Sequence, residues 1–258
     1  MKKNNLMRQN YVCKWLLVSG LLLAAGGVGA QQQGMGKSFS IEQLAVKNGV
    51  VQIGTAEELA IFAQAVSEGE TTVDAVLTAD IDNYTGPMIG TPSVQYAGTF
   101  DGQYHKITYT SEPTSAVWGL FRTLKGGTIK NLHVAGTLNT TQKQCGGLVG
   151  FMYGGSIENT ICSVDINTSF VGDAGTGGFV ASVMSRGTVI KDCVFMGSIN
   201  SETANCCAGI AGWTDDGASL TMTNCLSIAP ILADGGGGNV LGRNPGRVDF
   251  QNCYYLYA

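Results

Sequence analysis

The sequence has few histidines, and this argues against one large class of chemistry. Only His105 and His133 occur among 258 residues, and no HExxH motif contains them. Zinc peptidases of that class need two histidines one helical turn apart with a glutamate between them. A G-x-S-x-G motif, which marks a hydrolase serine on a strand-to-helix turn, is also absent. We expect no peptidase activity, although a dispersed Ser-His-Asp triad stays open.

Charge and proline are scarce as well. Charged residues make up 13% of the chain, against about 25% in an average soluble domain. The chain has 5 prolines but 37 glycines, without a triplet period, which excludes collagen and proline-rich linkers. Abundant glycine of this kind is typical of tight turns in an all-β chain.

Beyond its first residues, the sequence lacks an apolar stretch long enough to span a membrane. Residues 1–14 carry four basic side chains and no acid, residues 15–28 are mainly apolar, and Val28 and Ala30 are small. This order predicts a signal peptide at residues 1–30 that is cleaved after Ala30, since a spanning helix needs about 20 apolar residues. We expect an exported protein that is secreted, periplasmic or at the cell surface.

Export changes both the charge and the cysteine count. Without residues 1–30 the chain has 11 basic and 19 acidic residues and a net charge of −8, so nucleic acid is not an expected partner. Seven cysteines remain. An odd number in an exported protein leaves at least one thiol free or bonded to another chain.

The sequence also repeats itself. Ten-residue windows align at intervals of 28 to 33 residues, and a tetrapeptide similar to Gly-Leu-Val-Gly precedes each one. The windows begin at Ile129, Ile157, Ile190, Met222 and Phe250, and the tetrapeptides at Gly119, Gly147, Gly178, Gly209 and Asn239. Period-two alternation indicates strands, and length changes confined to loops are typical of a solenoid. We predict an all-β parallel β-helix at residues 116–258, with turns stacked about 4.8 Å apart.

One column of the aligned windows contains only asparagine and aspartate. Its members are Asn131, Asn159, Asp192, Asn224 and Asn252. Asn and Asp adopt the left-handed backbone conformation more readily than other non-glycine residues, and stacked amides can hydrogen-bond from turn to turn. We expect a structural ladder in the stacked interior, where its polar groups satisfy one another.

The next column contains Leu132, Thr160, Cys193, Cys225 and Cys253. We expect this column, and the one that begins with Ile129, to point inward. Neighbouring Cα atoms about 4.8 Å apart fall within disulfide range, but parallel side chains hold their Cβ atoms farther apart than the favoured ~3.8 Å. Buried free thiols are the favoured interpretation, and a disulfide is the alternative.

The region before the repeats, residues 31–115, contains one predicted helix. It covers residues 55–70, with Thr55 and Glu58 as a capping box. Because the open end of a β-helix exposes core and strand edges, we assign this helix a capping role. The remaining segments are an entering strand at 73–82 and a partial first turn of the coil at 98–109.

The order of these segments resembles the GLUG-motif proteins. The phrases TAEELAIFAQAV, LTADID and GTFDGQYHKI, followed by the repeated tetrapeptides, carry the resemblance over residues 50–258. Only the tetrapeptides at Gly147 and Gly209 match the motif fully, and the one at Asn239 departs from it. The resemblance implies a right-handed parallel β-helix and an exported, adhesion-like bacterial surface protein. It adds no activity, since the family has no settled one and supplies a non-catalytic segment to some immunoglobulin-cleaving metallopeptidases.

The carboxylates offer no clear catalytic pair. Glycoside hydrolysis needs two of them about 5 to 9.5 Å apart, and the aligned windows place no two on neighbouring turns of one column. Asp215 and Asp216 are adjacent in a predicted loop, where solvated turn residues are the simpler interpretation. Asp80, Asp82 and Asp101 offer oxygen ligands for Ca²⁺, but a hydrogen-bonding role in turns is favoured. We predict no metal and no cofactor.

Aromatic and arginine side chains follow the tetrapeptides on successive turns. Phe151, Ser182, Trp213 and Arg243 share one column. Such side chains are enriched at interfaces, although single exposed aromatics are common. The candidate ligand-binding residues are Phe151, Tyr153, Trp213, Asp215, Asp216 and Arg243.

The favoured function is that of an exported β-helical protein that binds a glycan or a surface or host protein along one face, without catalysis. The alternative is a polysaccharide-active lyase or hydrolase on the same fold. A structural subunit of an assembly is the third hypothesis.

Overall fold

The computed structural model describes residues 40–201, 203–228, 230–232 and 241–256. The predicted signal peptide lies outside these residues. The chain divides into two compact units, and the second, Ser38–Ala258, contains every described residue. Within the described part of the chain, no helix is long and apolar enough to cross a membrane.

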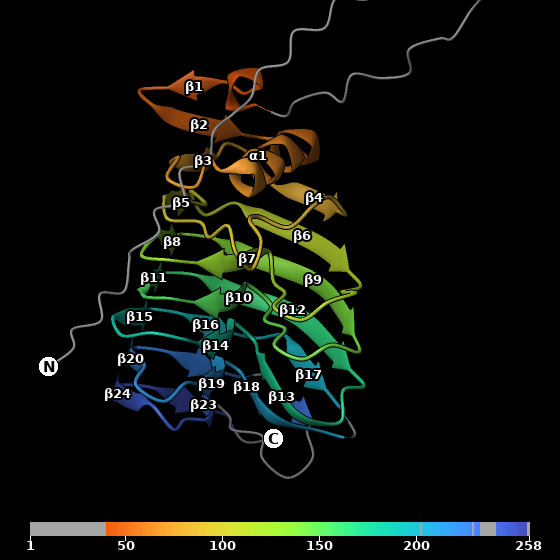
Figure 1. The fold of residues 1–258 in the computed structure, drawn as a ribbon, viewed down its shortest axis with the longest axis vertical. Helices are drawn as coiled ribbons and strands as arrows, with labels where there is room; N and C mark the ends of the chain where they lie inside the picture. Colours follow the sequence, from red (N-terminus) through yellow and green to blue (C-terminus); the bar gives the residue numbers. More distant parts are fainter. Residues whose placement is uncertain (1–39, 202, 229, 233–240, 257–258) are drawn as a thin grey trace, which may run out of the picture. The chain divides into compact units, whose positions relative to one another are not determined.

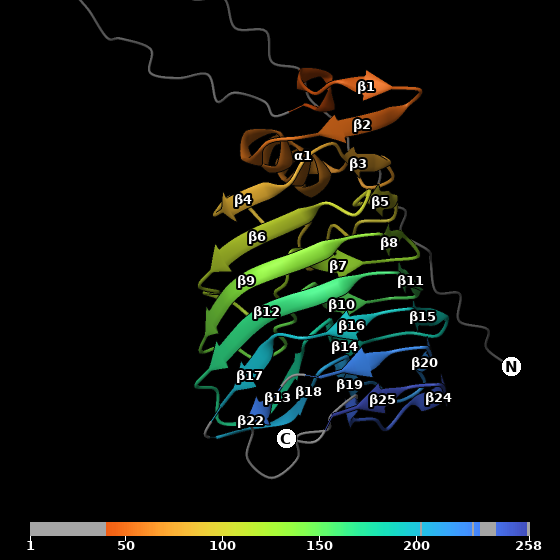
Figure 2. The same ribbon diagram turned by 180° about the vertical axis from the view of Figure 1, so that it is seen from behind.

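The described residues form a parallel β-solenoid of about seven turns, with one α-helix near its N-terminal end (Figures 1 and 2). Three long sheets run along the coil, and successive turns supply their successive strands. All strand pairs in these sheets are parallel except β1 with β2. The predicted fold class, a parallel β-helix, is therefore confirmed.

The first sheet contains, in spatial order, β1 (Val46–Lys47), β2 (Val50–Ile53), β3 (Ala75–Leu77), β5 (Thr99–Asp101), β8 (Thr128–Lys130), β11 (Gly155–Glu158), β15 (Thr188–Lys191), β20 (Ser219–Thr223) and β24 (Arg247–Gln251). The second contains β4 (Ile81–Tyr84), β6 (Lys106–Ser111), β9 (His133–Thr140), β12 (Ile161–Thr168), β16 (Val194–Phe195), β21 (Leu226–Ser227) and β25 (Tyr254–Tyr255). In the same sheet β17 (Ser198–Asn200) pairs with β12, and β22 (Ile231–Leu232) pairs with β17. The third contains β7 (Phe121–Leu124), β10 (Val149–Met152), β14 (Val180–Val183), β19 (Ala211–Thr214) and β23 (Leu241–Arg243). A two-stranded sheet pairs β13 (Gly172–Gly177) with β18 (Ala204–Ala208).

The repeat found in the sequence is the register of the first sheet. Ile129 pairs with Ile157, Ile157 with Ile190, and Ile190 with Met222. All four side chains are fully buried, so the same inward position is apolar on every turn. Phe250 continues this column on the last turn, opposite Met222.

The last residue of the tetrapeptide at Gly147 is Gly150, and a steric restriction explains why it is glycine. A Cβ atom added at Gly150 would lie 2.9 Å from the backbone N of Trp118 and 2.6 Å from the carbonyl O of Arg122. At Gly150 the backbone of the preceding turn therefore lies too close for a side chain, whereas the same position of the tetrapeptide holds Arg122 and Ala181 on two other turns. The motif records a close backbone approach and not a ligand site.

The asparagine column marks the bend between the first and second sheets. All five members have a positive φ, between 47° and 54°, which is the left-handed conformation that the sequence predicted. Asn131 is half-buried and the other four are exposed. The expectation that this ladder lies in the interior is wrong, because an outward corner residue points its side chain to solvent.

Helix α1 (Ala56–Glu68) covers the N-terminal end of the coil, as predicted (Figure 1). Its capping box is complete, with the backbone N–H of Glu58 donating to Thr55 Oγ1. Phe62 is fully buried, and its ring centroid lies 5.8 Å from that of Tyr96 and 5.9 Å from that of Phe100. A short 3₁₀ helix, η1 (Ile41–Gln43), precedes this end of the coil.

Two expectations for this region are wrong. Residues 73–82 are not one strand, because β3 and β4 are separate strands that belong to different sheets. Residues 98–109 are not the first turn, because β2 and β3 already pair in parallel before them. The turns near the helix lack the window motif, so the sequence repeat did not reveal them.

The cysteine column points inward. All seven described cysteines are free thiols, and six of them are buried, which agrees with the interpretation favoured from the sequence. Burial raises the pKa of Cys162 to about 12 and that of Cys145 to about 11. Cys162 and Cys145 are therefore neutral packing groups and not nucleophiles at ordinary pH.

Candidate binding groove

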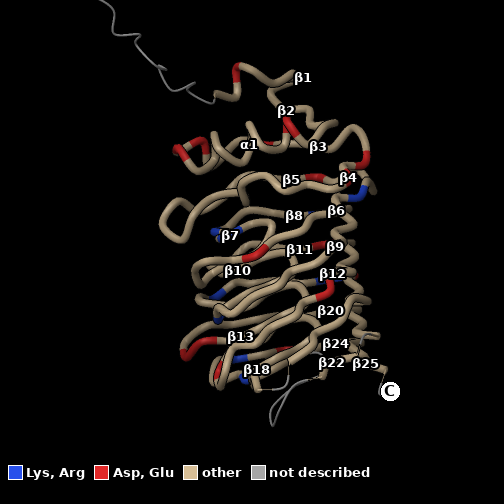
Figure 3. The backbone as a smooth tube through the Cα atoms, turned by 90° about the vertical axis from the view of Figure 1, so that its right-hand side faces the viewer, with Lys and Arg blue, Asp and Glu red and all other residues tan. Residues whose placement is uncertain are grey.

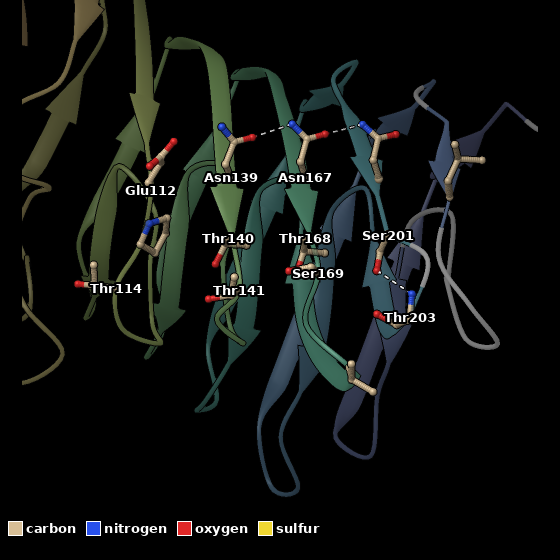
Figure 4. Close-up of a pocket in the computed structure, with 14 residues that line it drawn as sticks. Glu112, Thr114, Asn139, Thr140, Thr141, Asn167, Thr168, Ser169, Ser201 and Thr203 are labelled. Carbon is tan, nitrogen blue, oxygen red and sulfur yellow. Dashed lines mark hydrogen bonds between the residues drawn. The ribbon is translucent and has the colours of Figure 1, made fainter.

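A groove passes the ends of β9, β12 and β17 (Figure 4). The residues that line it come from five successive turns of the coil. Its volume is about 960 Å³. The side chains that line it are mostly hydroxyls and amides: Glu112, Pro113, Thr114, Asn139, Thr140, Thr141, Asn167, Thr168, Ser169, Val171, Asn200, Ser201, Thr203 and Leu232. At about 4.8 Å per turn, five turns extend over roughly 19 Å. The groove runs along the coil axis and therefore across the strands.

A row of asparagines follows one wall of the groove. Asn167 pairs with Asn139 and with Asn200 in the strand register. The Nδ2 of Asn167 donates to Oδ1 of Asn139 at 2.9 Å, and the Nδ2 of Asn200 donates to Oδ1 of Asn167 at 2.9 Å. Figure 4 shows the amides of Asn139 and Asn167 side by side in a row, joined by a hydrogen bond. The ladder fixes the orientation of the amides. The Nδ2 of Asn200 also donates to Ser198 Oγ at 3.2 Å, so the amide donors that remain available are those of Asn139 and Asn167.

The residue after each asparagine carries a hydroxyl that turns the chain. These residues are Thr140, Thr168 and Ser201. The hydroxyls of Thr140 and Thr168 each accept the backbone N–H two residues later, at 2.8 and 3.2 Å. Ser201 Oγ accepts the N–H three residues later, at 2.8 Å. Asn followed by Thr or Ser is thus a second repeated corner, where the amide faces out and the hydroxyl ends the strand.

The groove is almost uncharged. Among the residues that line it, Glu112 carries the only formal charge, and there is no lysine or arginine. Charged residues are sparse along the whole coil, as Figure 3 shows. A site without cations does not select phosphate, sulfate or carboxylate groups, so the chemistry of the lining favours neutral polar ligands.

The predicted aromatic strip lies on the third sheet, away from this groove. The register pairs Phe151 with Ser182, Ser182 with Trp213, and Trp213 with Arg243. Ser182 is only 1% exposed, because Gly175 of β13 lies over it, and a Cβ atom there would be 3.4 Å from Ser182 Oγ. The column is continuous in register, but β13 interrupts it at the surface.

The interruption leaves two small clusters. The rings of Phe151 and Tyr153 are in edge contact, with centroids 6.2 Å apart. The Arg243 guanidinium lies 5.2 Å from the centroid of the Trp213 ring, and its Nη1 lies 3.2 Å from Asp173 Oδ2. Arg243 therefore already has an aromatic and an anionic partner within the chain.

The predicted carboxylates are placed in turns. Asp215 and Asp216 follow β19, and Asp215 Oδ1 accepts from the indole Nε1 of Trp213 at 3.4 Å. Asp215 is half-buried and Asp216 is exposed. The structure thus joins Asp215 to the Trp213 cluster and leaves Asp216 facing solvent.

Asp80 and Asp82 are hydrogen-bonded to the next turn of the coil. Asp80 Oδ1 accepts from the backbone N of Lys106 and from His105 Nδ1, both at 3.0 Å. These bonds lower the pKa of Asp80 below its usual value. Asp82 Oδ1 lies 3.7 Å from Lys106 Nζ, and Asp101 Oδ1 accepts from Asn131 Nδ2 at 3.0 Å. Among the described residues, no three His, Cys, Asp or Glu side chains gather as a metal site would require.

The groove was not found from the sequence. A signal was present, because Asn139-Thr140, Asn167-Thr168 and Asn200-Ser201 recur at the intervals of the main repeat, 28 and 33 residues. The pairs at Asn139 and Asn167 also match the Asn-x-Ser/Thr glycosylation sequon. That interpretation does not indicate their recurrence at the repeat interval.

Comparison with known proteins supports the fold alone. No protein-family model matches the sequence, and no curated protein matches it significantly. One solved structure is similar, that of a Bacteroides ovatus protein provisionally named an immunoglobulin A1 protease. The two superpose with a TM-score of 0.62 at 16% identity, over 80% of this chain and 74% of the other. Similarity at this identity shows a shared β-helical architecture.

Proposed function

We propose that the protein is a non-catalytic binding module that holds a neutral glycan chain in the groove along β9, β12 and β17. The observation that carries the proposal is the asparagine row, which presents the same side chain at the same place on three successive turns. A polymer with repeating polar groups is the ligand that such a repeating wall can contact at several points.

Sugar hydroxyls match the groups that the row leaves available. Each side-chain amide has two N–H donors and a carbonyl oxygen with two lone pairs. In Asn167 one donor and one lone pair are used by the ladder, so one donor and one acceptor remain. A hydroxyl group both donates and accepts, and can bond to two adjacent amides. Val171 and Leu232, which are 74% and 62% exposed, offer apolar contact for the faces of sugar rings.

An extended peptide fits this wall less well. Its side chains on one face repeat every two residues, about 6.6 Å, whereas the amides repeat once per turn, about 4.8 Å. Moreover, a peptide usually binds by adding to a strand edge, and this groove runs across the strands. The repeat and the direction of the wall therefore disfavour an extended peptide.

Export belongs to the proposal as well. It rests on the resemblance of the sequence to GLUG-motif surface proteins and on the signal-like N-terminus. The similar Bacteroides ovatus structure is named for a protease, but the histidine content of this chain offers no HExxH zinc site. We therefore assign the coil a binding role at the cell surface or outside the cell, of an adhesion-like kind.

Hydrolysis of the bound glycan is the less supported alternative. Retaining and inverting glycosidases use two carboxylates on either side of the scissile bond. The groove lining supplies one, Glu112. With a single carboxylate the groove geometry favours holding a chain over cleaving it.

The test is calorimetric titration of the full chain with neutral hexasaccharides of glucose, mannose, galactose and N-acetylglucosamine. At least one should bind, and Asn167→Ala should weaken it about tenfold, as expected for the loss of one or two hydrogen bonds. Thr221→Ala, an exposed residue on the first sheet, is the matched control and should bind normally. Absence of binding by every oligosaccharide, or equal affinity of Asn167→Ala, would refute the proposal, and release of reducing sugar would favour the enzyme alternative.

A further inference from the structure

A second cavity, of about 720 Å³, meets the groove at Glu112, which borders both. Its walls come from helix α1, the loop between β4 and β5, the end of β6 and the start of β7. Among the described residues that line it, Arg122 is the only basic one. This cavity therefore contains the kind of charge that the groove lacks.

The guanidinium of Arg122 is held by one loop. Its Nε donates to the carbonyl O of Val117 at 2.9 Å. Its Nη2 donates to the carbonyl O of Ala116 at 3.0 Å and to Ser115 Oγ at 3.1 Å. The guanidinium carbon also lies 4.4 Å from the centroid of the Trp118 ring. These partners are all uncharged, and the two Nη1 hydrogens have no acceptor within the described part of the chain.

Arg122 differs in this respect from the other half-buried basic residues that the structure describes. Those are Lys106, Lys130 and Lys191, whose Nζ atoms lie 3.7, 3.5 and 3.1 Å from a carboxylate oxygen. Arg122 has no such ion pair with any described residue. Burial lowers its pKa, because the charged form has lost part of its water. A partly desolvated cation without a counter-ion is unfavourable, so the cavity favours an anion.

We infer that this cavity is a subsite for an acidic sugar, whose carboxylate or sulfate group accepts the free hydrogens of Arg122 Nη1. The inference rests on the proposed function, since the acidic sugar belongs to the glycan chain that the groove holds. The strand register supports the connection, because Ser111 pairs with Leu138 and Glu112 therefore follows opposite Asn139. The neutral part of the chain lies along the asparagine row, and its acidic end passes Glu112 to reach Arg122.

The rest of the cavity suits a sugar acid better than a polyanion. Thr85 and Thr110 are exposed hydroxyls in its lining, and neither side chain has a hydrogen-bond partner among the described residues. They can therefore bond to the hydroxyls of a sugar. Glu112 is also exposed, and its carboxylate accepts from hydroxyls but repels a second anionic group. One cation, one carboxylate and several hydroxyls match a ligand with a single anionic group.

The test is nuclear magnetic resonance of the full chain, labelled with nitrogen-15 and titrated with glucuronate, glucose 6-sulfate and glucose. The indole Nε1 of Trp118 donates to Ser111 Oγ at 2.9 Å, and its ring lies against the guanidinium, so its signal reports on the subsite. Glucuronate or glucose 6-sulfate should shift this signal to saturation, and the one that binds more tightly identifies the anionic group. Glucose should leave it in place. No shift with either acid, or an equal shift with glucose, would overturn the inference.

Two arginine variants provide the control. Arg122→Gln removes the cation and should weaken binding of the acidic sugar at least about tenfold. Arg186→Gln removes an exposed arginine elsewhere on the coil and should leave binding unchanged. Circular dichroism of both shows that the fold is intact, and if Arg122→Gln does not fold, the wild-type titration still decides. Equal weakening by the two variants would mean that net charge alone attracts the acid, which also contradicts the subsite.

The two proposals can fail separately. Asn167→Ala lies in the groove and should leave glucuronate binding unchanged. A hexasaccharide with one terminal acidic sugar should bind the wild type more tightly than its neutral counterpart, and Arg122→Gln should abolish that difference. Equal affinity of the two hexasaccharides for the wild type would refute the subsite and leave the groove. Binding of glucuronate without binding of any hexasaccharide would refute the groove and leave the subsite.

Discussion

The amide of Asn159 donates its Nδ2 hydrogen to Oδ1 of Asn131 at 2.9 Å, and the two residues are 28 positions apart in the sequence. The same bond joins Asn131 to Asp101 at 3.0 Å, Asn224 to Asp192 at 2.8 Å, and Asn252 to Asn224 at 3.1 Å. In every case the later turn donates to the earlier one. The bonds form two series, one from Asn159 through Asn131 to Asp101 and one from Asn252 through Asn224 to Asp192. Each series ends at an aspartate, which accepts but does not donate when it is ionised.

Asp192 is consequently a break in the ladder, and Asp192→Asn should repair it. The new Nδ2 would donate to Oδ1 of Asn159 and join the two series, while Asn keeps the left-handed conformation at φ 54°. We expect the free energy of unfolding to rise by about 0.5–1 kcal/mol, a modest gain because the corner is exposed. Urea unfolding measures it, with Asp216→Asn as a control for charge removal. A variant no more stable than this control would contradict the ladder.

The two roles of Asn159 can be separated by substitution. Asn159→Gly keeps access to the left-handed conformation and loses only the amide bonds, so it should cost about 1 kcal/mol or less. Asn159→Ala loses the bonds and also forces a Cβ into φ 47°, which adds roughly 1–2 kcal/mol. Chemical denaturation of both variants gives the comparison. Equal costs would mean that the backbone conformation at this bend is unimportant.

The capping helix should be essential to the N-terminal turns. Phe62 is fully buried against Tyr96 and Phe100, so Phe62→Ala should lower the free energy of unfolding by about 3–5 kcal/mol. Glu68→Ala, on the exposed end of the same helix, should change it by less than about 0.5 kcal/mol. Thermal and urea unfolding are the measurements. A loss below about 1 kcal/mol for Phe62→Ala would show that the helix does not close the core.

Alkaline pH should destabilise the coil through three of its buried thiols, those of Cys162, Cys145 and Cys207. The ordinary thiol pKa of 9.0 is raised by burial to about 12 in Cys162 and to about 11 in Cys145 and Cys207. Because the folded state holds these protons more tightly than the unfolded state, their contribution is complete below about pH 9. It is lost as the pH rises from 9 towards 12.

Urea unfolding at several pH values between 8 and about 11 checks this expectation. Stability should be constant up to about pH 9 and then fall. The fall should be smaller in Cys162→Ala, which removes the most strongly shifted of these three thiols. Tyr84 and Tyr96 act in the same direction, since burial raises the pKa of both. Stability that rises above pH 9 would contradict the buried, protonated state of these groups.

The fold was predictable because each turn of the coil repeats the same pattern of buried and exposed residues and the same backbone bend. An inward apolar residue such as Ile157 and an outward left-handed residue such as Asn159 recur at nearly fixed intervals, so alignment of the chain on itself yields the register. The turns before residue 116 lack this phrase, and they were recognised only in part. The exposure of the asparagine column was also missed. The sequence indicates a left-handed residue that bends the chain, but it does not show on which side of the bend the side chain lies.

The groove was harder to predict than the fold. Its wall depends on Asn139, Asn167 and Asn200, which contact one another only because three strands end at the same height. The aromatic strip shows the opposite error: Phe151, Ser182 and Trp213 do align in register, but β13 lies over Ser182. A column read from the sequence gives the neighbours of a residue along the coil and not what covers it.

The central claim, that the asparagine row on β9, β12 and β17 contacts a neutral glycan, is tested most directly by nuclear magnetic resonance of the side-chain amides. The full chain, labelled with nitrogen-15, is titrated with the neutral hexasaccharides. The account predicts that the amide signals of Asn139, Asn167 and Asn200 shift together and saturate, while those of Asn159 and Asn224 at the other corner do not move. Shifts confined to residues around Trp213, or no shifts with any of the sugars, would contradict it.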